Sequence, residues 1–546
     1  MYSRLTQSRC QACRNRKVKC SGAQPCRYCI KRRQQCIFPD NVRKKRYAVD
    51  YVEGLEALAR RSSGGIRSAE ASRDDEMPLP GGETDSEGAI IPETVNSSSV
   101  HFSNQIESLP SLQRPPTAST TADETLISDD VYRIHRPPLA VMPSEPEWPS
   151  PSQAHQLLDT HLFDPRTISD RLSLAFELPV SHDGWDSIHR LQLLMVFALG
   201  QLLGGELQAG EALPGIGFFH QVESRLPRLS VLRDLGLVAV ETLGLMAFYL
   251  QCADRRDDAY VHAGFALRLA ISHGLARTTD SALSRSEAAH RNRLWWTIYM
   301  QERRLASATG NPVSIQDDAI ATPPPTETPG FTSPTALNMN VKLARLTGQT
   351  METIYSHKSR SVSWYIRSVK VILGRLSRVA TSIPSKYSVD FAKPIVPSRT
   401  SATLHLMLYQ NIILVTRPTL LHLAKIKLAA ESDAASRMDT SLFANLSEAC
   451  TEAASRSLDL LLAMIKQRII ANFGFFDLDA TFSAAFVFVL IERIYPSSTN
   501  GNGVANIQRA SEIMQYLASR GNKAAAKRHA DLERICSHIG LSVGGG

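Results

Sequence analysis

Apolar residues recur at helical spacing along most of the chain after about position 153. The intervals between them are mostly three, four or seven residues, as on the buried face of an amphipathic helix, and few segments alternate like strands. Three such runs contain the following residues: Ile188, Leu191, Met195, Leu199 and Leu202; Leu235, Val238, Leu245 and Tyr249; and Leu404, Tyr409, Ile412 and Val415. The pattern predicts a large all-α domain over residues 148–541.

The segment before this domain has no such pattern. Residues 62–147 are rich in Ser, Thr, Pro, Gly and acidic residues and poor in aromatic ones, which predicts a disordered acidic linker. Residues 41–61 form a basic linker with a short seam of coiled-coil spacing. The seam comprises Ala48, Tyr51, Leu55 and Leu58, about one and a half heptads. We therefore expect a weak homodimer, with a monomer as the alternative.

Charge is distributed unevenly along the 546 residues, of which 43% are hydrophobic. Residues 1–61 hold 16 Lys and Arg against 4 Asp and Glu, whereas residues 62–147 hold 5 against 15. A basic segment this dense predicts a polyanionic partner, either nucleic acid or acidic lipid. No run of 18 apolar residues occurs, and no apolar signal core begins the chain, so we expect neither a membrane protein nor a secreted one.

Six of the nine cysteines form an internal repeat in the basic segment. The pattern Cys10-x2-Cys13-x6-Cys20 superimposes, at a period of 16, on Cys26-x2-Cys29-x6-Cys36. A structural zinc ion takes four ligands, so two Zn²⁺ ions held by six thiolates require two bridging cysteines. Symmetry favours Cys10 and Cys26 as the bridges. The repeat thus predicts a small zinc-stabilised domain over residues 1–40, with a disulfide framework or a single four-cysteine zinc site as alternatives.

Cations surround these cysteines. Between Cys13 and Cys20 the sequence Arg14-Asn15-Arg16-Lys17-Val18-Lys19 lacks Gly and Pro, which permits a short helix of a size that fits the major groove of DNA. Arg and Lys donate hydrogen bonds to guanine O6 and N7. The second half carries Lys31, Arg32 and Arg33 at the equivalent positions, and the array is followed by Arg43, Lys44, Lys45 and Arg46, a cluster typical of a nuclear import signal or of phosphate contacts.

The cysteine spacing, with Pro25 directly before Cys26, resembles that of the fungal zinc binuclear cluster transcription factors. This resemblance implies that Arg16 and Lys17 contact the bases of a CGG-type triplet in double-stranded DNA. Arg14, Lys19, Lys31, Arg32 and Arg33 are then expected to contact phosphates. It further implies regulation of RNA polymerase II transcription in the nucleus, two Zn²⁺ ions, and dimers that read paired triplets.

The helical region resembles the middle homology region of the same family. The stretches that carry this resemblance are 260–270, 273–275, 291–299, 310–312 and 409–418, with Glu302 where the family often has Asp. Trp295 and Trp296 are candidates for lining a ligand pocket, although two aromatic residues on a helix are more often core. Transcriptional coregulators and a small-molecule effector are the candidate partners of this region.

The sequence contains no Gly-x-Ser-x-Gly elbow, phosphate-binding glycine loop or His-Glu-x-x-His helix, so we do not expect an enzyme. The alternative to a DNA-binding regulator is a protein-interaction scaffold or ligand sensor in which the zinc cluster is only a staple. Such a staple would not require the cations between Cys13 and Cys20.

Overall fold

The computed structural model divides the chain into two compact units, residues 1–69 and 70–546. The structure describes residues 26–32 of the first unit and residues 96–108, 187–204, 212–277, 283–356, 361–430, 441–495 and 502–541 of the second.

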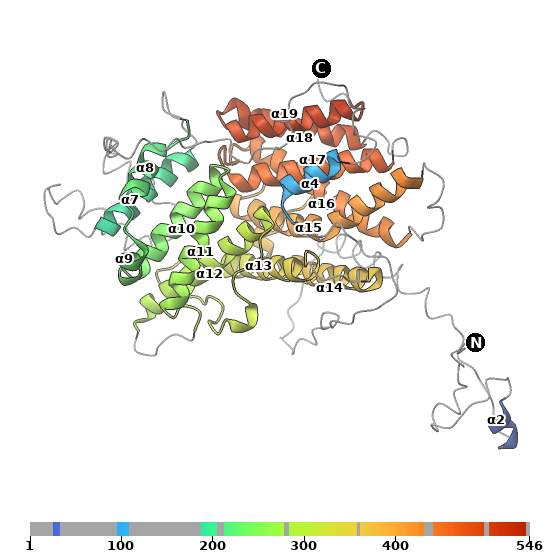
Figure 1. Ribbon diagram of the computed structural model, residues 1–546, viewed down its shortest axis with the longest axis horizontal. Coiled ribbons are helices and arrows are strands. Elements are labelled where there is room, and N and C mark those ends of the chain that lie inside the picture. Colours follow the sequence, from blue (N-terminus) through green and yellow to red (C-terminus); the bar gives the residue numbers. More distant parts are fainter. Residues whose placement is uncertain are drawn as a thin grey trace. The chain divides into compact units, whose positions relative to one another are not determined.

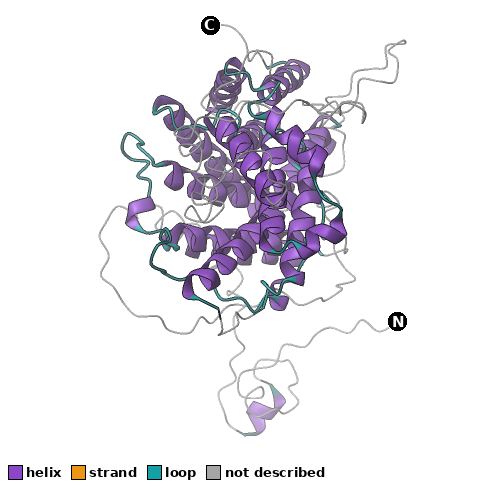
Figure 2. Cartoon of the chain, turned by 90° about the vertical axis from the view of Figure 1, so that its left-hand side faces the viewer, coloured by secondary structure: helices purple, strands orange, loops and turns teal. Residues whose placement is uncertain are grey.

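The regular elements in these residues are all helices, as Figure 2 shows. The prediction of a large all-α domain is therefore confirmed for the part of residues 148–541 that is described. In the first unit the helix is α2 (Arg27–Lys31). In the second unit the helices are α4 (Ser99–Glu107), α7 (Ser187–Gly204), α8 (Ile216–Arg225), α9 (Leu229–Asp234), α10 (Leu237–Cys252), α11 (Arg256–Ser272), α12 (Arg285–Thr309), η4 (Asp317–Ala319), α13 (Thr335–Thr353), α14 (Val362–Thr381), η5 (Ser385–Tyr387), α15 (Arg399–Ala430), α16 (Ser441–Lys466), α17 (Phe475–Ile494), α18 (Asn502–Ser519) and α19 (Lys523–His538).

Helices α10 and α17 form the centre of the second unit. Nearly every residue of both helices is buried, and a helix that is apolar on all sides must be surrounded by other elements. Helix α10 packs against α7, α11 and α12, while α17 packs against α15, α16 and α18. Helix α13 contacts both α12 and α15, and in Figure 1 it lies between these two groups of helices. Residues from both groups therefore meet along this junction.

Local sequence signals set several helix ends. Helix α12 begins after Ser284, whose hydroxyl accepts the backbone N–H of Glu287 at 3.2 Å, as the pattern Ser-x-x-Glu predicts. It ends at Gly310, which has a φ of 75°, a conformation that glycine adopts without strain. Helices α14 and α19 begin in the same way at Ser361 and Asn522. These caps fix where the long buried helices begin relative to the residues they carry.

One of the predicted runs is divided between two helices. Leu235 follows the end of α9, whereas Val238, Leu245 and Tyr249 lie in α10. The break occurs at Gly236, whose φ of 72° cannot continue a right-handed helix. In the other two runs, each residue lies within a single helix, α7 or α15.

The structure differs from the predicted linker at residues 96–108. The disorder predicted for residues 62–147 does not hold here, because α4 packs on the second unit with Val100, Phe102 and Ile106 buried. The Ser-rich composition around these residues predicts disorder, but the core supplies the tertiary packing that so short a helix needs. The other residues of the predicted linker lie outside the described ones.

None of the helices in the described part of the chain combines the length and the apolar content that crossing a bilayer requires.

Candidate zinc centre and the pocket of the helical unit

The second half of the cysteine repeat begins a short helix. Cys26 is the N-cap of α2, with extended backbone, and its Sγ accepts the backbone N–H of Cys29 at 3.4 Å. Both cysteine side chains are fully buried. The Sγ of Cys26 therefore lies at the N-terminal end of a short helix, near the positive end of the helix dipole.

Two buried cysteines separated by two residues, the first of them capping a helix, are suitable donors for a tetrahedral zinc ion. The residues that are described therefore fit the predicted metal. Their four partners, Cys10, Cys13, Cys20 and Cys36, lie outside the described residues, and within those residues no group of three or more His, Cys, Asp or Glu side chains is placed to hold a metal. The assignment of Cys10 and Cys26 as bridges therefore stays a prediction.

The exposed surface of α2 is basic. Lys31 lies in its last turn and Arg32 directly follows it, and both side chains are exposed. The helix thus turns its thiols inward and its cations outward, as a phosphate-contacting element requires. Ile30, 59% exposed, lies on the same outward surface.

The structure does not describe the other residues that the sequence predicts to contact DNA, to serve nuclear import or to form the dimer seam. They lie outside the described residues and comprise Arg14, Arg16, Lys17, Lys19, Arg33, Arg43, Lys44, Lys45, Arg46, Ala48, Tyr51, Leu55 and Leu58.

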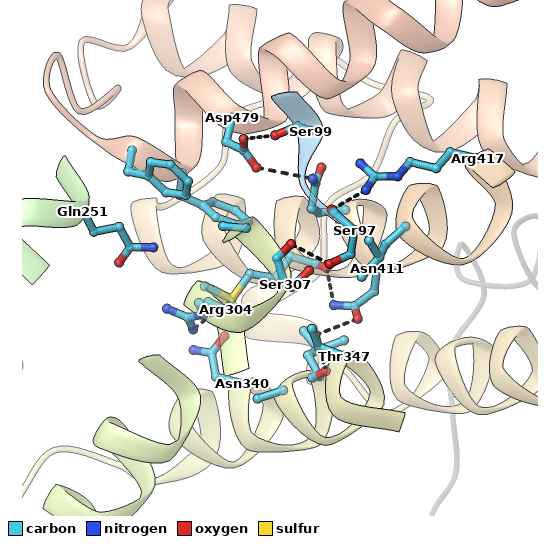
Figure 3. Close-up of a pocket in the computed structure, with 18 residues that line it drawn as sticks. Ser97, Ser99, Gln251, Arg304, Ser307, Asn340, Thr347, Asn411, Arg417 and Asp479 are labelled. Carbon is cyan, nitrogen blue, oxygen red and sulfur yellow. Dashed lines mark hydrogen bonds between the residues drawn. The ribbon is translucent and has the colours of Figure 1, made fainter. Parts of the chain in front are cut away.

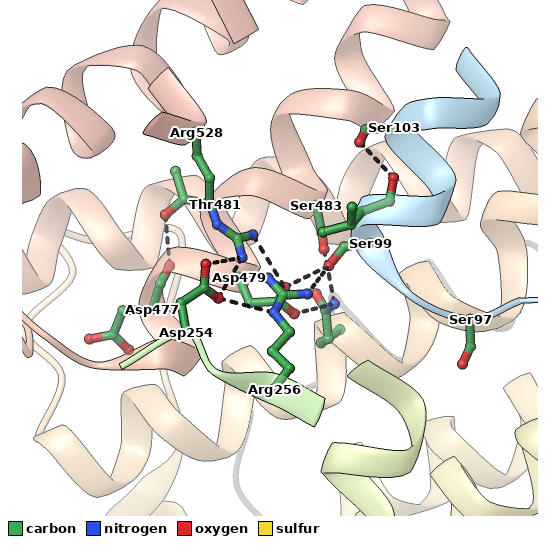
Figure 4. Close-up of polar contacts among 12 residues, drawn as sticks. Ser97, Ser99, Ser103, Asp254, Arg256, Asp477, Asp479, Thr481, Ser483 and Arg528 are labelled. Atoms are coloured by element: carbon green, nitrogen blue, oxygen red, sulfur yellow. Dashed lines mark hydrogen bonds and ion pairs between the residues drawn. The ribbon is translucent and has the colours of Figure 1, made fainter. Parts of the chain in front are cut away.

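The helical unit contains a buried network of charges that sequence reasoning did not identify (Figure 4). Asp254 accepts hydrogen bonds from Arg256 at 3.0 Å and from Arg528 at 2.8 Å. Asp479 lies 3.6 Å from Arg256 and 3.8 Å from Arg528, and it accepts the hydroxyl of Ser99 at 2.6 Å. Burial raises the pKa of Asp254, and the charge of Arg256 opposes that rise. The network joins α4, α11, α17 and α19, so it attaches the α4 segment to the core.

The residues just before α4 are held at a second point. The hydroxyl of Ser97 donates to the carbonyl of Ser307 at 2.8 Å, and the guanidinium of Arg417 donates to the carbonyl of Ser97 and to the hydroxyl of Tyr355. Between these contacts and the charge network lies a pocket of about 60 Å³ at the junction of α4, α10, α12, α13, α15 and α17 (Figure 3).

No pattern in the sequence indicates this pocket. Its lining residues are Ser97, Ser99, Gln251, Arg304, Ser307, Ala308, Asn340, Leu343, Ala344, Thr347, Met407, Gln410, Asn411, Leu414, Arg417, Phe475, Phe476 and Asp479. Neither Trp295 nor Trp296 is among them. Both are fully buried, and the indole N–H of Trp296 donates to the carbonyl of Pro323 at 2.9 Å. The two tryptophans are therefore core residues, and the pocket is lined by both polar and apolar residues from six helices and the residues next to them.

Comparison with known protein families defines the class of both units. Residues 9–45 match the model of the fungal Zn(2)-Cys(6) binuclear cluster domain, and residues 171–383 match that of the fungal specific transcription factor domain. The resemblance to the fungal zinc binuclear cluster transcription factors is therefore confirmed at both domains.

Individual relatives agree with this class. The chain is 28% identical over 368 residues to the uncharacterized transcriptional regulatory protein C3C7.04 of Schizosaccharomyces pombe, which covers 65% of this chain and 44% of that protein. It is 24% identical over 342 residues to the thiamine repressible genes regulatory protein thi1 of the same organism, covering 60% of this chain and 42% of thi1. The chain thus spans less than half the length of these two relatives.

A shorter match has a higher identity. The transcription factor ROB1 of Candida albicans is 52% identical over 48 residues, 9% of this chain and 5% of ROB1. The names of these relatives and of the domain matched by residues 171–383 are those of transcriptional regulators, and none is that of an enzyme.

Proposed function

We propose that this chain is a zinc-dependent, sequence-specific DNA-binding factor that regulates RNA polymerase II transcription in the nucleus. The observation that carries the proposal is the repeated cysteine array, matched over residues 9–45, in which Cys26 and Cys29 are buried at the start of a helix with exposed cations. Zinc would supply the free energy that orders a segment too small to build its own core.

Six cysteines would hold two Zn²⁺ ions, with Cys10 and Cys26 bridging. The repeat also suggests where the base-reading residues lie. A shift of 16 positions relates Arg16 to Arg32, which directly follows α2, and relates Lys17 to Arg33. By this symmetry, Arg16 and Lys17 stand at the end of the first short helix, where their side chains can reach the guanines of a CGG-type triplet.

The other cations would position the protein on DNA. Arg14, Lys19, Lys31, Arg32 and Arg33 are proposed to contact phosphates, and residues 43–46 to contact phosphates or serve nuclear import. The seam from Ala48 to Leu58 would form a weak homodimer that reads two triplets. The helical unit would bind transcriptional coregulators.

Selection from random double-stranded DNA with the full-length chain tests this proposal. We expect enrichment of sequences that contain CGG-type triplets. Arg16→Ala or Lys17→Ala is expected to reduce the preference for that triplet by about 1–3 kcal/mol, whereas Arg14→Ala should weaken binding to all sequences equally. A DNA pool that stays random would refute the proposal and favour an interaction scaffold stapled by zinc. Equal losses from all three variants would refute the division between base and phosphate contacts.

A further inference from the structure

Two consecutive arginines of α12 have opposite surroundings. Arg303 is buried beside carboxylates, 2.9 Å from Glu302 and 3.1 Å from Asp317. Arg304 lines the pocket, and its guanidinium donates to the thioether sulfur of Met407 at 3.2 Å. Among the described residues no carboxylate pairs with Arg304. Burial lowers the pKa of Arg304 to about 10, so this side chain still carries its charge near neutral pH.

An unpaired charge inside a protein is costly, and buried cations normally have an anionic partner. The neighbouring buried arginines follow this rule, since Arg256 and Arg528 share Asp254 and Asp479. Arg417, which also lines the pocket, donates hydrogen bonds to the carbonyl of Ser97 and to the hydroxyl of Tyr355. Arg304 differs from Arg256, Arg528 and Arg417 in the acceptor that it contacts. Its guanidinium contacts the neutral, weakly accepting sulfur of Met407.

The pocket also offers acceptors that have no donor. The amide oxygens of Asn340 and Gln410 are buried and receive no hydrogen bond. The orientation of Gln410 is fixed, because its amide nitrogen donates to Ser483 at 3.0 Å and approaches Asp479 at 3.5 Å. Figure 3 shows Arg304 and Asn340 side by side along one wall. An occupant that satisfies both kinds of group needs an anionic end and a hydrogen-bond donor.

The size of the pocket limits that occupant. About 60 Å³ is room for roughly four to six water-sized groups, and side chains such as Leu343, Leu414 and Phe475 supply apolar contacts. An amino acid would bring a positive and a negative charge together, and would leave the charge of Arg304 uncompensated overall. A small hydroxy acid brings one negative charge and one hydroxyl donor.

We propose that this pocket binds a small hydroxy acid, with its carboxylate on Arg304 and its hydroxyl donating to Asn340 or Gln410. The occupant would also contact the N-terminal end of α4 and the residues just before it, because Ser99 and Ser97 belong to the same lining. This inference does not rest on the proposed DNA binding, since it concerns the helical unit and can be tested without DNA.

Thermal unfolding of the full-length chain with lactate tests the proposal. We expect lactate at millimolar concentration to raise the Tm saturably, by about 2 °C or more. Propionate, which lacks the hydroxyl, should bind roughly tenfold more weakly, and 1,2-propanediol, which lacks the carboxylate, should not shift the Tm. A larger shift with L-alanine or with inorganic phosphate than with lactate would overturn the assignment, as would the absence of any shift with lactate.

Variants separate a ligand site from a structural arginine. Arg304→Met should abolish the response to lactate while leaving the Tm of the unliganded protein equal or higher, because a half-buried charge without an anionic partner is removed. Arg367→Met makes the same change at an exposed position of α14 and should keep the full response. A response to lactate that survives Arg304→Met, or a lower Tm of the unliganded Arg304→Met variant, would contradict the proposal.

Discussion

Three cysteines outside the repeat have the properties of inert core thiols. Cys252, Cys450 and Cys536 are free and buried in the second unit. Burial raises the pKa of Cys252 to about 11 and those of Cys450 and Cys536 to about 12. Since only the thiolate reacts with alkylating agents, these three side chains should stay unmodified in the folded protein at pH 8.

Alkylation followed by mass spectrometry can therefore distinguish the two groups of cysteines. We expect the folded, zinc-loaded chain to take up almost no label, the chelated chain to take up label at the six cysteines of the repeat, and the denatured chain to take up label at all nine. Rapid labelling of Cys450 in the native protein would contradict its assignment to the core.

The buried carboxylate of Glu302 in α12 is paired with the neighbouring Arg303. It is fully buried, accepts a hydrogen bond from Arg303 at 2.9 Å, and accepts the backbone N–H of Ser314 at 2.6 Å. Arg303→Met should lower the free energy of unfolding by about 3–5 kcal/mol, because it leaves a buried carboxylate without its cation. Urea denaturation would measure this loss. A loss no larger than that of Arg304→Met would show that the pairing of Glu302 with Arg303 does not stabilise the fold.

At the scale of elements, α4 is a short helix that packs mainly on α17. Phe102 is 4% exposed, and the guanidinium of Arg417 lies 4.9 Å from the centre of its ring. Phe102→Ala should remove about 3–5 kcal/mol of packing free energy. A helix of nine residues is too short to stay folded without that packing. Hydrogen exchange should therefore accelerate over residues 99–107 and stay slow in α17.

Gln105→Ala, at a half-buried position of the same helix, is the matched control and should leave exchange unchanged. If Phe102→Ala left the exchange of α4 slow, or melted α17 together with it, α4 would not be an independently docked segment.

The elements also show how far sequence reasoning extends. The all-α class was predictable, because residues such as Leu404 and Val415 recur with helical spacing over long runs. Helix α4 was not, because Phe102 and Ile106 form a pattern too short to stand out from a Ser-rich segment. The pocket was not predictable either, since Arg303 and Arg304 are identical neighbours and only the packing of α12 gives one of them carboxylate partners.

At the scale of the whole molecule, the composition of the two units predicts two different sources of stability, an apolar core and bound metal. The helical unit has a large apolar core centred on α10 and α17, and burial of that core stabilises its fold. Residues 1–40 are rich in charge and cysteine, so their order is expected to depend on metal binding. The spacing of the cysteines was enough to predict the zinc site, because metal coordination restricts the identity and spacing of its ligands more strictly than apolar packing restricts core residues.

The central claim is that six thiolates hold two zinc ions. Elemental analysis of the purified full-length chain, with protein concentration measured in the same sample, tests it most directly. We expect two zinc ions per chain for the native protein. We expect fewer zinc ions per chain for Cys26→Ser, in which the serine can still cap α2. A native chain with reduced cysteines and no zinc, or one whose six N-terminal cysteines are paired in disulfides, would contradict the account.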